Sequence, residues 1–172
     1  AFRGGVAAEA DAILIPEIPF TMEALCVKIH ERYDKGPKFA IIVCAEGAVL
    51  KGGGHFIKGK KESGREHPHL GGIAEFVAKE IQKLTGHESR SLVLGHLQRG
   101  GEPTTFDRLL GTRLGVAAVE LIESGKFGHM TALKPPRIVS VPIIRAISKM
   151  KKVPVNSDVV RAAKALGISF GD

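Results

Sequence analysis

The first third of the chain alternates short apolar runs with a segment of helical period. Residues 12–16 (AILIP) and 39–44 (FAIIVC) are continuous apolar runs, typical of strands that are buried on both faces. Between them, Leu25 and Ile29 follow at helical spacing after Thr21, a residue type that caps helix N-termini. A strand, a helix and a second strand joined by short links predict a right-handed parallel crossover.

The rest of the chain continues this alternation. Residues 73–84 place apolar side chains on one helical face, and residues 91–94 (SLVL) predict a third strand. Thr104 and Asp107 form a pattern like a capping box at the start of a longer apolar helix. Four shorter elements complete the chain: strands at 130–133 and 137–141, and helices at 142–150 and 156–166. The order of elements predicts an α/β fold.

Composition places the chain among ordered proteins of one domain or slightly more. It has 172 residues, of which 44% are hydrophobic, and no apolar run is long enough to span a membrane. Cys26 and Cys44 lie in a predicted helix and at the end of a predicted strand. They are expected to be reduced, buried thiols of a cytoplasmic protein.

The formal net charge of +7 raises the alternative of a nucleic-acid-binding domain. One Tyr and no Trp leave no interleaving of basic and aromatic residues, so this alternative depends on net charge alone. Lys58, Lys60 and Lys61 stand among Gly and Ser and are expected in a solvated surface loop over residues 48–70. A small phosphorylated ligand would also use clustered cations.

The residues with the clearest chemical signal follow two predicted strands. His96 and Arg99 lie in a Gly-rich run after residues 91–94, and Glu46 follows residues 39–44. Ligands of open parallel sheets bind beyond the carboxyl ends of the strands. Arginine suits phosphate oxygens, and a carboxylate accepts hydrogen bonds from sugar hydroxyls. The pattern indicates a sugar-phosphate site, while a Gly-rich turn with a surface arginine, and a capping glutamate, remain the simpler readings.

Four segments resemble the phosphofructokinase family, and the resemblance extends over essentially the whole chain. The most specific is Gly-His-Leu-Gln-Arg-Gly-Gly at 95–101, followed by Pro103 and by Phe-Asp-Arg at 106–108. The others are the runs ADAILIPEIP at 10–19, VCAEGA at 43–48 and IVSVP at 138–142. The resemblance implies a parallel-sheet, three-layer α/β fold, of which this chain is the C-terminal part.

The family also implies a division of the chain and a reaction. Residues 1–100 would belong to the sugar-phosphate-binding domain, residues 101–153 would pack on a nucleotide-binding domain, and residues 154–172 would return to the first domain as a helix. The reaction would be phosphoryl transfer from ATP or pyrophosphate to fructose 6-phosphate in glycolysis. The alternative is a truncated, non-catalytic module for sugar-phosphate binding or oligomerisation.

Roles for individual residues follow from the same resemblance. Glu46, His96 and Arg99 would bind fructose 6-phosphate within one subunit. Arg90 would reach the 6-phosphate bound in a neighbouring subunit, which implies a homo-oligomer, commonly a tetramer. Without the resemblance, Arg90 would be read as a structural ion-pair residue.

The family's catalytic parts are expected upstream of Ala1. These are the donor loop, the aspartate base and most of the Mg²⁺ site, so the isolated chain is expected to be inactive. The Gly-rich stretch at 51–54 lacks the strand–loop–helix context of a phosphate cradle and does not replace the donor loop. Glu17, Lys35 and Lys38 match an effector site of bacterial relatives only in part, because Pro37 and Phe39 depart from its pattern.

Overall fold

The chain forms two compact units in a computed structural model that describes residues 1–54 and 72–172. Unit 1 comprises Ala1–Val93 and Lys152–Asp172, and unit 2 comprises Leu94–Lys151. The loop predicted at 48–70 falls mostly outside the described residues, and so do Lys58, Lys60 and Lys61.

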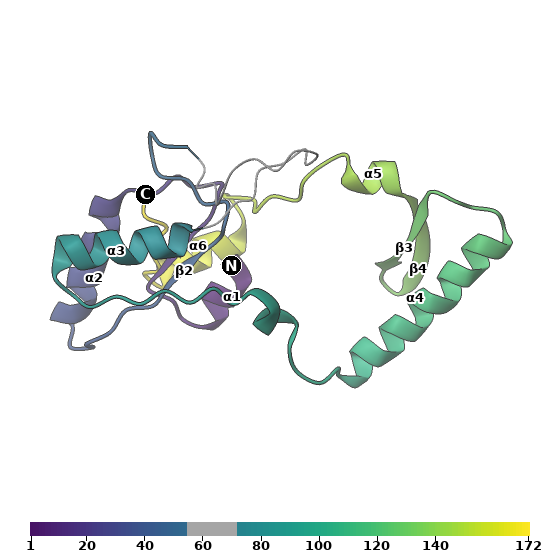
Figure 1. The fold of residues 1–172 in the computed structure, drawn as a ribbon, viewed down its shortest axis with the longest axis horizontal. Coiled ribbons are helices and arrows are strands. Elements are labelled where there is room, and N and C mark those ends of the chain that lie inside the picture. The colour runs from purple at the N-terminus through teal and green to yellow at the C-terminus, as the bar shows by residue number, and fades with distance from the viewer. Residues whose placement is uncertain (55–71) are drawn as a thin grey trace. The chain divides into compact units, whose positions relative to one another are not determined.

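A parallel pair of strands lies at the centre of unit 1. Strands β1 (Ala12–Leu14) and β2 (Ile42–Cys44) pair in register, with Ile13 opposite Val43 (Figure 1). Ser169, near the C-terminus, adds a parallel bridge to β1. The predicted parallel pairing is confirmed, although both strands are shorter than the apolar runs that signalled them.

One face of β1 packs against two helices. Helices α2 (Met22–Asp34) and α3 (Ile73–Thr85) share a buried cluster with Ala12 and Leu14. Leu25 of α2 is fully buried there. Residues 12 and 14 lie on the same face because successive side chains of a strand point to opposite faces.

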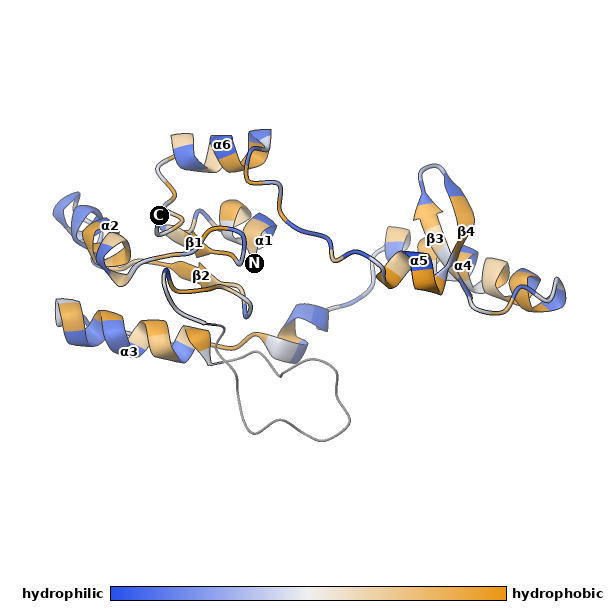
Figure 2. Cartoon of the chain, turned by 90° about the horizontal axis from the view of Figure 1, so that it is seen from above, coloured by the Kyte–Doolittle hydropathy of each residue, from blue (hydrophilic) through white to orange (hydrophobic). Residues whose placement is uncertain are grey.

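The opposite face of β1 is covered by elements from both ends of the chain. Ile13 and Ile15 share a second buried cluster with residues of helix α6 (Asp158–Ala165) and with Phe170, and residues of helix α1 (Phe2–Ala7) pack against it. Figure 2 shows the strands between α6 and α1 on one side and α3 on the other. Unit 1 is therefore a three-layer α/β structure, which confirms the predicted fold class.

Residues that cap helices lie where the sequence predicts them: hydroxyl side chains begin α2 and α6, and a glycine ends α3. The hydroxyl oxygens of Thr21 and Ser157 accept hydrogen bonds from the backbone N–H groups of Ala24 and Val160. Gly86 ends α3 in the left-handed conformation, with φ of 74°. These local signals set the ends of α2, α3 and α6 to within one or two residues of the prediction.

Helix α1 was not predicted, because its sequence contains Gly4 and Gly5, which disfavour helix. Its position explains Gly5. A side chain at that residue would meet the Ile13 side chain at 2.7 Å, so the helix can approach the strand only with glycine there. Tertiary packing stabilises a helix that local propensity does not favour.

Unit 2 contains a hairpin and a long helix. Strands β3 (His129–Lys134) and β4 (Arg137–Pro142) pair antiparallel around the expected turn. Helix α4 (Thr105–Glu123) packs against the hairpin, and a hydrogen bond from Arg113 Nη2 to the Pro136 carbonyl (2.7 Å) joins the two. The helix predicted at 142–150 is shorter, α5 (Ile143–Ile147).

Unit 2 has no buried residue, although its helix and strands are rich in apolar side chains. Along α4, Phe106, Leu109 and Ile122 are 62%, 58% and 62% exposed. The capping box predicted for Thr104 and Asp107 is complete. No helix in the described residues is both long and apolar enough to cross a bilayer.

The strand predicted at residues 91–94 is wrong. The segment has no strand assignment and pairs with no strand in the described part of the chain. Leu92 and Val93 are 71% and 67% exposed. A buried strand needs a neighbouring strand and a covering layer, and a local apolar pattern cannot show whether either exists.

Candidate functional site

Glu46 lies in a tight turn at the carboxyl end of β2. The backbone N–H of Ala45 donates to the Leu14 carbonyl (2.8 Å), and that of Ala48 donates to the Ala45 carbonyl (2.9 Å). These bonds fix the turn to the end of the parallel pair, and the Glu46 side chain is exposed. Its position agrees with the rule that ligand-binding groups follow the carboxyl ends of parallel strands.

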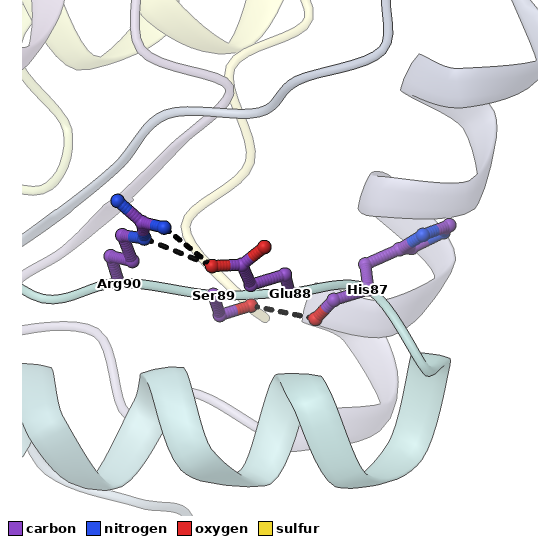
Figure 3. Close-up of polar contacts among 4 residues, drawn as sticks. All are labelled: His87, Glu88, Ser89 and Arg90. Atoms are coloured by element: carbon purple, nitrogen blue, oxygen red, sulfur yellow. Dashed lines mark hydrogen bonds and ion pairs between the residues drawn. The ribbon is translucent and has the colours of Figure 1, made fainter.

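Arg90 lies on the segment that follows α3, which belongs to no helix or strand. Its Nε and Nη2 groups both donate to Oε1 of Glu88, at 3.0 and 2.8 Å (Figure 3). Both side chains are largely exposed, at 87% for Arg90 and 72% for Glu88. Arg90 is thus a cation at the surface of unit 1, held by a carboxylate two residues earlier in the chain.

Local contacts anchor the backbone that carries Arg90. The Thr85 hydroxyl donates to the Ile81 carbonyl (2.7 Å) and accepts from the His87 N–H (3.2 Å). The His87 ring stacks on Tyr33 of α2, with ring centres 4.0 Å apart and planes inclined by 20°. The segment therefore has a fixed attachment to α2, although it belongs to no sheet.

His96 and Arg99 share one short element of unit 2. They lie in the 3₁₀ helix η1 (Gly95–Arg99), which starts at a glycine with φ of 47°. Both side chains are exposed. A turn with one imidazole and one guanidinium at its surface can donate hydrogen bonds to an anionic ligand.

The pattern at 91–94 predicts a strand that would carry His96 to the sheet edge beside Glu46. That strand does not form, so this prediction of the position of His96 is wrong. Glu46 and Arg90 belong to unit 1, while His96 and Arg99 belong to unit 2. A single pocket formed by all four residues stays a prediction.

The residues that match the effector pattern have contacts within unit 1. Oε1 of Glu17 accepts a hydrogen bond from the Val153 N–H (2.8 Å), which ties the returning C-terminal segment to the turn after β1. The Lys38 ammonium lies 6.0 Å from the centre of the Tyr33 ring. The Glu17 carboxylate thus has a structural role that the sequence did not reveal.

Both cysteines are free thiols, as predicted, and both are partly rather than fully buried. Burial raises the pKa of the Cys44 thiol to about 11. Burial, and then the charge of Glu23, also raise the pKa of Cys26. High thiol pKa values disfavour the nucleophilic thiolate, so these cysteines are suited to packing and not to covalent catalysis.

Sequence reasoning missed the residues that hold Arg90. Glu88 and Arg90 are two positions apart, and in extended backbone such side chains point to the same side. That spacing is the local signal that could have found the pair. The contact between Tyr33 and His87 joins residues 54 positions apart and had no local signal.

Comparison with known proteins shows which proteins this chain resembles in sequence. The family model described as phosphofructokinase matches residues 1–122. An ATP-dependent 6-phosphofructokinase of Chloroflexus aggregans is 47% identical over 172 residues, which is 100% of this chain and 46% of that protein. A pyrophosphate–fructose 6-phosphate 1-phosphotransferase of Amycolatopsis methanolica is 43% identical over 155 residues, which is 90% of this chain and 45% of that protein.

Solved structures agree with the fold. A pyrophosphate-dependent phosphofructokinase from Marinobacter aquaeolei superposes with a TM-score of 0.61 at 21% identity, over 92% of this chain and 37% of its own. The phosphofructokinase of Saccharomyces cerevisiae gives 0.62 at 23% identity, over 97% of this chain and 20% of its own. The chain spans less than half the length of the curated relatives that it matches.

Proposed function

The chain belongs to the phosphofructokinase family, and we propose that it is the C-terminal portion of a 6-phosphofructokinase. The complete enzyme would transfer a phosphoryl group from ATP or pyrophosphate to the 1-hydroxyl of fructose 6-phosphate, giving fructose 1,6-bisphosphate in glycolysis. The observation that carries this proposal is 47% identity, over the whole chain, to a protein named for that activity. Because relatives with both donor names match, the donor is proposed only as one of the two.

This part of the enzyme would supply the fructose 6-phosphate site. Arg99 and His96 would bind the sugar phosphate from the turn η1, and Glu46 would accept hydrogen bonds from sugar hydroxyls. The exposed positions of all three support this assignment, because no internal partner in the described residues would have to be displaced first. Binding and orienting the acceptor hydroxyl lowers the entropic part of the barrier to transfer.

The role proposed for Arg90 is to bind the 6-phosphate held by a neighbouring subunit of a homotetramer. An exposed guanidinium on an anchored segment supports this role, since its side chain can meet a ligand outside its own subunit. A glycolytic enzyme of this kind would work in the cytoplasm.

Mg²⁺ would neutralise charge on the phosphoryl donor in the complete enzyme. In the described residues, no three imidazole, thiol or carboxylate groups come together as metal ligands. We assign this chain the positioning of the acceptor and derive no step through the metal.

Residues 101–153 are proposed to pack on the nucleotide-binding domain, which would come from the part of the relatives that this chain does not span. The absence of buried residues in unit 2 supports this, because its apolar side chains need a covering surface. A hydrophobic dye should therefore bind the isolated chain. A monodisperse chain that binds no dye would overturn this part of the proposal.

The alternative is a non-catalytic module that binds a sugar phosphate or mediates oligomerisation. It differs from the leading proposal in one respect that genomic sequence can settle. An open reading frame that continues upstream of Ala1 into a Gly-rich loop and a Thr-Ile-Asp motif would favour the enzyme. A start codon immediately before Ala1 would favour the module.

The binding test is a calorimetric titration of the chain with fructose 6-phosphate. Saturable binding that Arg99→Ala abolishes and Arg137→Ala preserves would support the proposed site. Arg137 is a matched control, because it is an exposed arginine of unit 2 outside the proposed site. If both variants bind as the unsubstituted chain does, the assignment of Arg99 is wrong.

A further inference from the structure

The contact between Glu88 and Arg90 follows from the backbone that carries them. Residues 87–90 belong to no helix or strand, and Figure 3 shows the side chains of Glu88 and Arg90 turned toward each other while that of Ser89 points to the other side of the chain. The Ser89 hydroxyl donates to the His87 carbonyl (3.2 Å), as Figure 3 shows. With His87 stacked on Tyr33, the geometry that brings the carboxylate to the guanidinium is attached to the core of unit 1.

The contact occupies one edge of the guanidinium fork. Oε1 of Glu88 accepts from Nε and from Nη2, whereas Nη1 points away from the carboxylate in Figure 3. Within the described residues, Glu88 is the only hydrogen-bond partner of the Arg90 side chain. An arginine binds a phosphate best through two parallel N–H groups. The Nε–Nη2 edge would provide such a pair if Glu88 did not hold it.

The charge of Glu88, like its position, weakens the binding of an anion to Arg90. A carboxylate that contacts the guanidinium neutralises its attraction for anions and repels a phosphate that approaches from nearby. An anion must therefore either displace Glu88 or bind the remaining edge beside a negative charge.

We propose that Glu88 is an affinity-setting residue for Arg90: it competes with the phosphate group of the ligand for the guanidinium. This rests on the proposed role of Arg90 in phosphate binding. Glu88 orients the arginine when no anion is bound and weakens anion binding by a modest factor. Exposed ion pairs are individually weak, so the expected factor is about two- to fivefold.

The test uses the chain labelled with ¹⁵N-arginine and inorganic phosphate as the probe. The Nε–Hε signal of Arg90, assigned with Arg90→Lys, is followed during a phosphate titration at low ionic strength. In Glu88→Gln, which keeps an oxygen acceptor but loses the charge, half-saturation should need about two- to fivefold less phosphate. Glu88→Asp, which keeps the charge, should stay closer to the unsubstituted chain.

Glu75→Gln is the matched control, because Glu75 also forms an exposed ion pair in unit 1, with Lys79 at 2.8 Å. It removes the same charge without touching Arg90, and its titration should match that of the unsubstituted chain. A gain in affinity shared by Glu75→Gln would show a general charge effect and overturn the proposal. Unchanged or weaker phosphate binding in Glu88→Gln, or no response of Arg90 in any variant, would overturn it as well.

Competition by fructose 6-phosphate separates this proposal from the function on which it rests. If phosphate shifts the Arg90 signal with the expected dependence on Glu88 but fructose 6-phosphate does not compete, the inference about Glu88 holds and the assigned substrate fails. If fructose 6-phosphate competes equally in all variants, the substrate holds and the role of Glu88 fails.

Discussion

The two units have comparable apolar patterns and opposite degrees of burial. In unit 1, Phe20, Leu14 and Ile13 are fully buried, whereas unit 2 buries none of its residues. Helix α3 of unit 1 and helix α4 of unit 2 both carry large apolar side chains, but α3 packs against α2 and has three buried residues, whereas α4 has none. An apolar helical face predicts that the helix packs against another surface. Only the structure shows whether that surface belongs to this chain.

Substitution of one phenylalanine in each unit is the strongest test of this difference in burial. Phe20 is 0% exposed in unit 1 and Phe106 is 62% exposed in unit 2. Phe20→Ala should lower the free energy of unfolding of unit 1 by about 3–5 kcal/mol, because it leaves a cavity in a packed core. Phe106→Ala should change it by less than about 0.5 kcal/mol.

Tyr33 is the only tyrosine and there is no tryptophan, so its fluorescence during urea denaturation reports on unit 1. A destabilisation by Phe106→Ala as large as that by Phe20→Ala would contradict the difference between the units.

The rate at which a thiol reacts should also differ between the two units. At pH 8, Cys44 of a Cys26→Ser chain should react with Ellman's reagent about a hundredfold more slowly when folded than in urea, because its pKa is raised to about 11. A cysteine introduced at Val119, 55% exposed on α4, should react within a few-fold of the unfolded rate when both natural cysteines are serine. Slow reaction at position 119 would mean that α4 is covered.

The contribution of a polar contact to the unfolding free energy should also differ between the two units. Oδ2 of the buried Asp11 accepts from the Ile41 N–H (2.8 Å), and its Oδ1 lies 3.2 Å from Arg32 Nε. Asp11→Ala should cost about 1–3 kcal/mol of unfolding free energy, because it leaves the partly buried Ile41 N–H without its acceptor and removes the carboxylate of the ion pair with Arg32. Asp11→Asn should cost less, since its amide oxygen can still accept.

Arg113→Ala in unit 2 removes one exposed hydrogen bond to the Pro136 carbonyl and should change the unfolding free energy by less than about 0.5 kcal/mol. Equal losses for Asp11→Ala and Arg113→Ala in urea denaturation would remove the distinction between buried and exposed contacts.

The smallest expected effect is a pH dependence at the start of α4. Hydrogen bonds from the Thr104 hydroxyl and backbone N–H lower the pKa of Asp107 below its ordinary value of 3.8. A lowered pKa in the folded state stabilises the cap above pH 3.8, and this contribution is lost as the pH falls through the lowered value. Thr104→Val should raise the pKa of Asp107 toward its ordinary value, as measured by carboxyl NMR titration.

Ser157→Ala, which removes the cap of α6 in unit 1, is the control for this measurement. It should leave the titration of Asp107 unchanged. An unshifted Asp107 in Thr104→Val would show that the capping box does not form in solution.

Much of the fold was predictable because its signals are local. Thr21, Gly86, Thr104 and Ser157 mark helix ends, and each has the capping role that its residue type predicts. The parallel pairing of β1 and β2 followed from two apolar runs joined by a helix. The candidate site was less predictable, because the placement of His96 relied on a strand at 91–94 that does not form.

The sequence by itself determined the family and the three-layer α/β class, because motifs and periodicity are properties of neighbouring positions, and its assignment of residues to a sugar-phosphate site stays a prediction. Only the tertiary structure decided that α1 packs on Ile13 through Gly5, that Glu88 holds Arg90 and that unit 2 lacks a core. Burial and side-chain contacts depend on which surfaces meet, and a pattern of apolar residues does not specify its partner.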